Sequence, residues 1–161
     1  MNIHKMEYKF AKPDDLSKWL EVADSVGKIM RVPDMRNDIN FLNYAKRKLE
    51  QNNAIMAYDS HHKNCAGFIG FSYNNNSITW LGVKKEYHNQ GIGSKLLSAA
   101  LNELNQNKTI RLNTYPENYL PGQPARKLYF KYGFVETTGD IFIHDGLEMV
   151  EMSLDYDINE K

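Results

Sequence analysis

The sequence predicts a mixed α/β domain of the α+β type, with a mostly antiparallel sheet of about seven strands flanked by about four helices. Segments that alternate polar and apolar residues, typical of strands, occur beside segments with helical apolar spacing. Three strand-like segments also follow one another directly, whereas later ones are separated by helices, as in a crossover. No repeat, linker or charge block divides the 161 residues, so we expect residues 1–161 to form a single domain.

The amino-terminal third predicts one strand and two helices. Residues 4–10 alternate in polarity and predict a strand. The next segment has apolar residues at i, i+3, i+4 and i+7, which predicts a helix that Asp14 or Asp15 caps and Gly27 ends. A second helix is predicted over about residues 38–51. Its expected inner face consists of Leu42, Ala45 and Leu49.

The middle of the chain predicts three strands and a helix. The strands are Ala54–Asp59, Ala66–Tyr73 and Ser77–Val83, and Asn74–Asn76 forms a tight hairpin turn between the last two. A helix then follows the letters GIG and extends to about Gln106. Its buried stripe is expected to contain Leu97, Ala100, Leu101 and Leu104.

The carboxy-terminal part predicts a strand, a helix and two final strands. The first strand covers residues 109–115, and the loop PENYLPG after it contains two prolines that oppose regular structure. The helix has Pro124 in its first turn and Gly133 at its end. The last strands, residues 134–143 and 148–155, are joined at the turn sequence HDG.

Composition excludes several classes of protein. Twenty Lys and Arg balance 20 Asp and Glu, so neither nucleic-acid nor membrane-surface binding is expected. The first residues lack the apolar core of a signal peptide, and no apolar run is long enough to cross a membrane. Cys65, the only cysteine, is interpreted as a buried small hydrophobe, and His61–His62 lacks further ligands for a metal. We therefore expect a cytoplasmic protein without a metal.

The most informative segment is WLGVKKEYHNQGIGSKLLSAAL, in which a predicted strand leads through a glycine-containing turn into a helix. The start of a helix presents unpaired backbone N–H groups and the positive end of the helix dipole, which together bind phosphate. Gly91 and Gly93 would let a diphosphate approach the main chain. The segment is not a P-loop, and Leu96 replaces the third glycine of a dinucleotide-binding fingerprint.

Two motifs resemble those of the GNAT superfamily of acetyl-CoA-dependent N-acetyltransferases. The acyl-CoA signature [QR]-x-x-G-x-[GA] is similar to residues 88–93, HNQGIG, in which His88 replaces Gln or Arg. The carboxy-terminal motif A-x-x-x-Y-x-x-x-G-F is similar to residues 125–134. Gly122 stands where the family commonly has Asn, so Asn113 or Asn118 is the alternative contact to the cofactor arm. The resemblance implies a single GNAT-like domain.

The resemblance also implies an activity: direct transfer of an acetyl group from the cosubstrate acetyl-CoA to a primary amine of a small molecule or peptide. Tyr129 would be the catalytic general acid, and the family's usual Glu is replaced by Ser77 and Thr79, which leaves the general base unassigned. The alternative is an acyl-CoA-binding sensor or pseudoenzyme without turnover. The expected cofactor-binding residues are Leu81, Gly82, Val83, His88, Asn89, Gln90, Gly91, Ile92, Gly93, Ser94, Lys95 and Arg126.

The acceptor amine is not defined by these motifs. Carboxylates in predicted loops or at strand ends would attract a cation such as a polyamine, an aminoglycoside or a lysine side chain. Monomer and homodimer both remain open. The carboxylates in question are Glu117, Asp140, Asp145 and Glu148.

Overall fold

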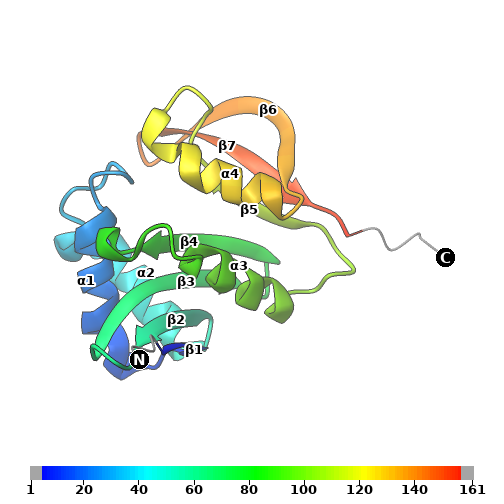
Figure 1. Ribbon diagram of the computed structural model, residues 1–161. Helices are drawn as coiled ribbons and strands as arrows, with labels where there is room; N and C mark the ends of the chain where they lie inside the picture. The colour runs from blue at the N-terminus through cyan, green and yellow to red at the C-terminus, as the bar shows by residue number, and fades with distance from the viewer. Residues whose placement is uncertain (1–4, 157–161) are drawn as a thin grey trace.

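The computed structural model describes residues 5–156, which form seven strands and four α-helices in the predicted order (Figure 1). His4, the first residue of the first predicted strand, lies outside the described residues. The elements are β1 (Met6–Phe10), α1 (Leu16–Val26), α2 (Ile39–Glu50), β2 (Ala54–Asp59), β3 (Asn64–Ser72), β4 (Ser77–Val83), α3 (Ile92–Glu103), β5 (Ile110–Thr114), α4 (Gln123–Lys131), β6 (Val135–His144) and β7 (Leu147–Leu154).

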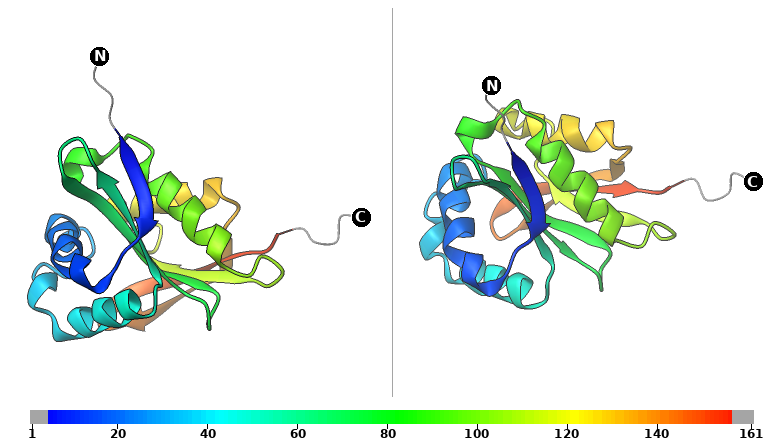
Figure 2. Two further views of the ribbon diagram at one scale, coloured as in Figure 1. Left: turned by 90° about the horizontal axis from the view of Figure 1, so that it is seen from below. Right: turned by 60° about the horizontal axis from the view of Figure 1, so that its bottom comes forward.

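The strands form one mixed sheet in the order β1-β2-β3-β4-β5-β7-β6. Neighbouring strands are antiparallel except β4 and β5, which are parallel. This confirms the predicted fold class. In Figure 2, α1 and α2 lie on one face of the sheet and α3 lies on the other. The cleft described below passes from one of these faces to the other.

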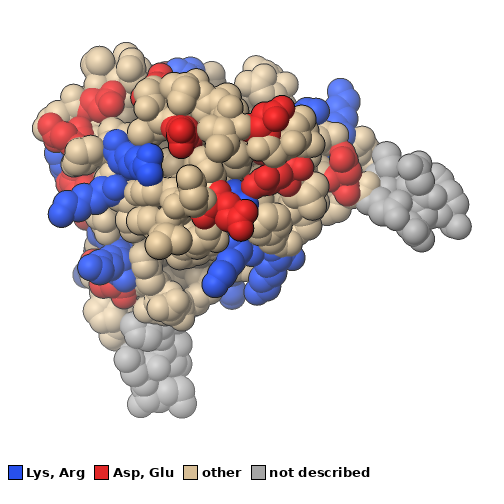
Figure 3. All heavy atoms as spheres, turned by 90° about the horizontal axis from the view of Figure 1, so that it is seen from above, with Lys and Arg blue, Asp and Glu red and all other residues tan. Residues whose placement is uncertain are grey.

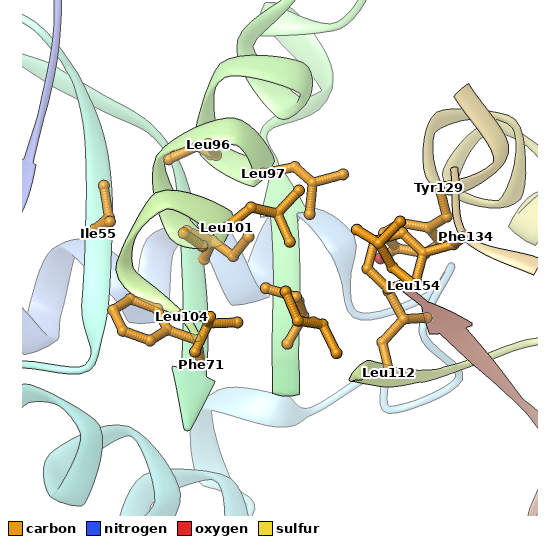
Figure 4. Close-up of a cluster of buried hydrophobic side chains, with 14 of the residues drawn as sticks. Ile55, Phe71, Leu96, Leu97, Leu101, Leu104, Leu112, Tyr129, Phe134 and Leu154 are labelled. Carbon is orange, nitrogen blue, oxygen red and sulfur yellow. The ribbon is translucent and has the colours of Figure 1, made fainter. Parts of the chain in front are cut away.

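The apolar residues form two cores, one on each face of the sheet. Trp19 of α1 stacks on Phe68 of β3 with 4.8 Å between ring centroids, in the core beneath α1 and α2. The other core lies beneath α3 and α4, and Figure 4 shows the leucines of α3 in it. Cys65 is buried as predicted, and burial raises the pKa of its thiol to about 12.

Two details of the helices differ from the sequence predictions. Asp15 precedes α1, but its carboxylate accepts the backbone N–H of Lys12 at 2.8 Å and no N–H group of the helix, so the predicted side-chain cap is wrong. In α2, Phe41 is buried and Leu42 is only half-buried. Ala45 and Leu49 are buried as predicted, but Phe41 takes the place of Leu42 on the inner face, because it packs against Trp19 with 5.9 Å between ring centroids.

The sheet is divided where β4 and β5 run parallel to each other. β4 and β5 are paired at a single position, Ser77 with Arg111, and in Figure 1 the β5–β7–β6 part lies apart from β4 with α4 beside it. Asn76 fastens the joined end, because its side-chain amide donates to the carbonyl of Asn105 at 2.9 Å and accepts the N–H of the same residue at 2.8 Å. Beyond this point the two strands are not paired.

The described residues include no helix long and apolar enough to cross a membrane. Figure 3 shows acidic and basic side chains interspersed on one face of the molecule. At the far edge of the sheet, β6 carries exposed Ile141, Phe142 and Ile143.

A buried carboxylate fixes the turn that follows β4. Asp59, at the end of β2, is fully buried and accepts the hydroxyl of Tyr87 at 2.8 Å and the backbone N–H of His62 at 3.1 Å. Burial alone would raise the pKa of Asp59, but these hydrogen bonds and the His62 ring outweigh it and hold the pKa at about 2. Tyr87 ends the short 3-10 turn Lys85–Tyr87, so Asp59 positions the segment that leads to α3.

We expect Asp59→Asn to lower the free energy of unfolding at pH 7 by about 1.5–3 kcal/mol, because the variant loses hydrogen bonds to an ionised group. The pKa of the folded state lies below the ordinary value of 3.8, so the contribution of Asp59 is complete above about pH 4 and is lost as the pH falls toward about 2. Urea unfolding at pH 7, 4 and 2.5 measures both effects. Asp24→Asn, which breaks an exposed ion pair with Arg36, is the control and should cost less than about 1 kcal/mol. Equal losses in the two variants would contradict this account.

Candidate active site

A cavity of about 710 Å³ lies where β4 and β5 separate. β4 forms one wall from Ile78 to Val83, and β5 with the residue after it forms the other from Leu112 to Tyr115. The start of α3, one face of α4, the end of α1 with the residues after it, and Met149 of β7 also line the cavity. The separation of two neighbouring strands thus creates a cleft through the sheet, with one end beside α3 and the other beside the end of α1.

The start of α3 presents unpaired amides at one end of this cleft. The first helical hydrogen bond joins the N–H of Lys95 to the carbonyl of Gly91 at 3.1 Å. Within residues 5–156, no acceptor pairs with the N–H groups of the four residues from Gly91 to Ser94. Gly91 has a φ of +77°, which favours glycine, and the space around its Cα is open. An anion can therefore reach these amides directly.

β4 supplies further main-chain groups to the cleft. The N–H of Lys84 donates to the carbonyl of Ala66 in the register that also pairs Val83 with Gly67 and Gly82 with Phe68. Because hydrogen-bonded and non-bonded pairs alternate along an antiparallel ladder, the groups of Gly82 point to β3. Those of Leu81 and Val83 point away from β3, toward the cleft. The N–H groups of Leu81 and Val83 and the carbonyl of Leu81 therefore face the cleft, the carbonyl of Val83 accepts from His88, and the groups of Gly82 bond to β3.

A bulge in β4 changes which side chains enter the cleft. The pairing with β3 skips Thr79, so that Gly70 faces Trp80 and Phe71 faces Ile78. A bulge redirects neighbouring side chains, and here both Thr79 and Trp80 lie on the face covered by α1 and α2. The hydroxyl of Thr79 is 2.5 Å from that of Tyr44, and Trp80 packs against Trp19.

His88 braces the turn between β4 and α3. Its Nε2–H donates to the carbonyl of Val83 at 2.9 Å, and its backbone N–H donates to the carbonyl of Lys85 at 3.1 Å. The side chain that replaces Gln or Arg in the motif therefore holds the end of β4 against the amide turn. His88 and Asn89 also line the cavity.

Tyr129 lies on α4 and lines the cavity from the side opposite β4. It is 7% exposed and packs edge-on against Phe134, with 5.9 Å between ring centroids. Burial, with a smaller contribution from Tyr115, raises the pKa of Tyr129 well above its ordinary value. The phenol is therefore fully protonated at neutral pH, as a proton donor must be.

Three expected cofactor-binding residues do not line the cavity: Gln90, Lys95 and Arg126. The ammonium of Lys95 lies 6.0 Å from the ring centroid of Tyr8. Arg126 is buried, and its guanidinium donates to Glu136 at 2.6 Å and to the carbonyl of Tyr115 at 3.1 Å. These contacts hold α4 against β6 and the end of β5, which is a structural role.

Ser94 both lines the cavity and joins the two sides of the cleft. The hydroxyl of Tyr132, the residue after α4, donates to the carbonyl of Ser94 at 2.9 Å, and the two hydroxyls are 2.6 Å apart. The tyrosine donates its proton to the carbonyl, so the Ser94 hydroxyl is the donor between the two oxygens. α3 and α4 are thus linked across the gap between β4 and β5.

The residues at the other end of the cleft are not among the predicted site residues. Tyr115 donates its hydroxyl to the carbonyl of Met30 at 2.5 Å, and Tyr119 donates to Ile29 at 2.7 Å, so the loop after β5 is fastened to the turn after α1. The loop also contains the 3-10 turn Leu120–Gly122, where the prolines had predicted no regular structure. A Cβ at Gly122 would meet the side chain of Tyr115 at 3.1 Å, which is a tight contact. Asn113 lines the cavity and Asn118 does not.

A sheet split between two parallel strands, with the free amides of a helix at the split, defines a class of protein that binds a phosphate-bearing ligand alongside its strands. Comparison with known families identifies the class further. The family model described as an acetyltransferase (GNAT) domain matches residues 37–156. The chain therefore belongs to the GNAT acetyltransferase family.

Solved structures of GNAT proteins share the fold. A GNAT-family acetyltransferase from Bacillus cereus is 17% identical, with a TM-score of 0.71 over 94% of this chain and 97% of that one. The PaiA N-acetyltransferase from Thermoplasma acidophilum, solved with coenzyme A, is 19% identical, with a TM-score of 0.70 over 94% and 99%. Arabidopsis thaliana Naa50, solved with a bisubstrate analogue, is 21% identical, with a TM-score of 0.68 over 94% and 99%. A search of curated proteins found no match.

Proposed function

We propose that this protein transfers an acetyl group from acetyl-CoA to a primary amine of a small molecule or peptide by direct attack. The observation that carries the proposal is the row of unpaired amides from Gly91 to Ser94, at one end of a cleft that Tyr129 also lines. The family to which the chain belongs and the coenzyme A complex of a protein with the same fold support it.

The residues present fit acetyl-CoA. The amides at the start of α3 suit its diphosphate, and neither Gly91 nor Gly93 has a side chain to keep that group at a distance. The main-chain groups of Leu81, which face the cleft, suit an amide of the pantetheine arm, which would lie along β4 like a strand. When bound, acetyl-CoA supplies the acetyl group as a reactive thioester.

In the proposed reaction a neutral amine forms the new C–N bond to the acetyl carbon while the C–S bond breaks. The N–H of Val83 faces the cleft and would stabilise negative charge on the carbonyl oxygen. The hydroxyl of Tyr129 would give its proton to the departing sulfur and later recover one from solvent. Among the described residues that line the cavity there is no carboxylate, so we assign the proton lost by the amine to water.

Calorimetry with acetyl-CoA, followed by thiol release with a panel of primary amines, tests the proposal. We expect saturable binding of acetyl-CoA and thiol release that depends on the amine. Binding without release above background would instead identify the acyl-CoA-binding sensor. A protein that binds no acetyl-CoA would exclude both.

A further inference from the structure

Beyond the row of amides and Tyr129, the cleft has a second end whose surface bears on the acceptor. We call this surface the acceptor wall. It extends to the face of the sheet covered by α1 and α2, where Met30 and Trp80 pack, whereas Ile92 at the start of α3 packs on the opposite face. The wall consists of Val26, Ile29, Met30, Trp80, Tyr115 and Met149.

The acceptor wall is apolar and held in place. The hydroxyls of Tyr115 and Tyr119, in the loop after β5, donate to the carbonyls of Met30 and Ile29. Each of these hydroxyls therefore donates its proton within the protein and not to a bound molecule. Trp80 packs against Trp19, with 5.7 Å between ring centroids. A wall of this kind offers a bound molecule apolar contact rather than hydrogen bonds.

The apolar surface continues onto the edge of the sheet. Met149 of β7 is paired directly with Phe142 of β6, so the two side chains lie on the same face. Phe142 is 36% exposed although it is a large apolar residue. An exposed aromatic ring beside an apolar cavity marks a binding surface more often than an isolated exposed residue does.

Charge is absent from this surface. Among the residues of the described chain that line the cavity, none is Asp, Glu, Lys or Arg. The carboxylates expected to attract a cation, Glu117, Asp140, Asp145 and Glu148, are all exposed and lie outside the lining. Arg31 lies beside the wall, with its guanidinium 5.9 Å from the ring centroid of Tyr115 and 3.7 Å from that of Tyr119. A cationic acceptor would meet a positive charge there and no carboxylate.

These observations concern the acceptor of the proposed acetyl transfer, and the inference rests on that proposed function. We infer that the acceptor is a primary amine attached to an apolar body, such as an arylalkylamine or the amino end of a peptide with a large apolar first residue. Burying a polyamine or aminoglycoside here would leave several ammonium groups without partners, which is strongly unfavourable. An apolar amine loses a single charge, and burial favours the neutral form that attacks the thioester.

The test compares four acceptors at saturating acetyl-CoA: 2-phenylethylamine, a short peptide that begins with Met, spermidine and kanamycin. We expect at least one of the two apolar acceptors to have a kcat/KM about 10-fold or more above both polycations. The first two acceptors distinguish a small amine from a peptide end. Preference for spermidine or kanamycin would overturn the inference, and so would binding of acetyl-CoA without transfer to either apolar amine. Failure to bind acetyl-CoA would instead remove the proposed function.

A matched pair of variants locates the preference. Ile29→Glu places a carboxylate in the acceptor wall at a residue that is 40% exposed, and it keeps the carbonyl that accepts from Tyr119. It should lower kcat/KM for the preferred apolar amine about 10-fold and raise that for spermidine. Ile39→Glu adds the same charge at a residue that is 64% exposed and outside the cavity, and should change neither value. Equal effects of the two variants would show that the wall does not choose the acceptor.

Discussion

Replacing Tyr129 by Phe is expected to lower kcat by about 10²- to 10⁴-fold, the usual contribution of a general acid. The hydroxyl is the only group removed, and the ring that packs against Phe134 remains. The affinity for acetyl-CoA should change by less than about two-fold, because the proton transfer belongs to the reaction and not to binding. Stopped-flow thiol release and calorimetry measure the two quantities separately.

The control for this variant is Tyr73→Phe, which removes a phenol that is bonded to Glu103 and lies outside the cavity. Its kcat should match that of the unmodified protein. The pH profile gives a further check, because burial raises the pKa of Tyr129 and the acid must be protonated to act. Activity should therefore persist at pH values where an ordinary tyrosine, with a pKa of about 10, has lost its proton. Unchanged kcat in Tyr129→Phe would remove this residue from the mechanism.

Replacing Gly93 by Glu is expected to raise the dissociation constant of acetyl-CoA by about 100-fold or more. The carboxylate would lie among the amides that are to hold the diphosphate, and like charges placed together cost several kcal/mol. The fold should survive, since a Cβ at Gly93 makes ordinary contacts at 3.5 Å with Leu128 and 3.8 Å with Val83. A carboxylate in the first turn of α3 also favours the helix, so the melting temperature should not fall.

Two controls separate position from charge and from size. Asn102→Glu adds the same charge to the exposed surface of the last turn of α3 and should leave binding unchanged. Gly93→Ala adds the methyl group alone and should weaken binding less than Gly93→Glu does. If Gly93→Glu and Asn102→Glu bind acetyl-CoA equally well, the start of α3 is not the diphosphate site.

Local patterns in the sequence were sufficient to predict most of the fold. The limits of β2 and β4 are those predicted, because the asparagine-rich turn and the alternation of apolar residues leave little choice of register. The turn before α3 was equally readable, since glycines at the start of an amphipathic helix are a local signal. The cap of α1 could not be predicted in this way, because the carboxylate of Asp15 accepts from the backbone N–H of Lys12, three residues before it.

The parts of the candidate site that sequence analysis missed depend on contacts between distant residues. The bulge at Thr79 arises from the register between β3 and β4, which no short pattern encodes. Tyr115 is 85 positions from Met30, and no sequence pattern in either segment predicts their hydrogen bond. Arg126 appeared available for a phosphate until its partners, Glu136 and the carbonyl of Tyr115, were known.

The single bridge between Ser77 and Arg111 has a consequence for how the molecule is held together. Beside that bridge, the Asn76 side chain bonds to the main chain of Asn105, and the hydroxyls of Ser94 and Tyr132 link α3 to the end of α4. Acetyl-CoA lying along β4 would act as an eighth strand between β4 and β5, present only while the ligand is bound. Because such a ligand binds the folded chain alone, the supply of acetyl-CoA would then govern the resistance of the protein to unfolding as well as its rate of turnover.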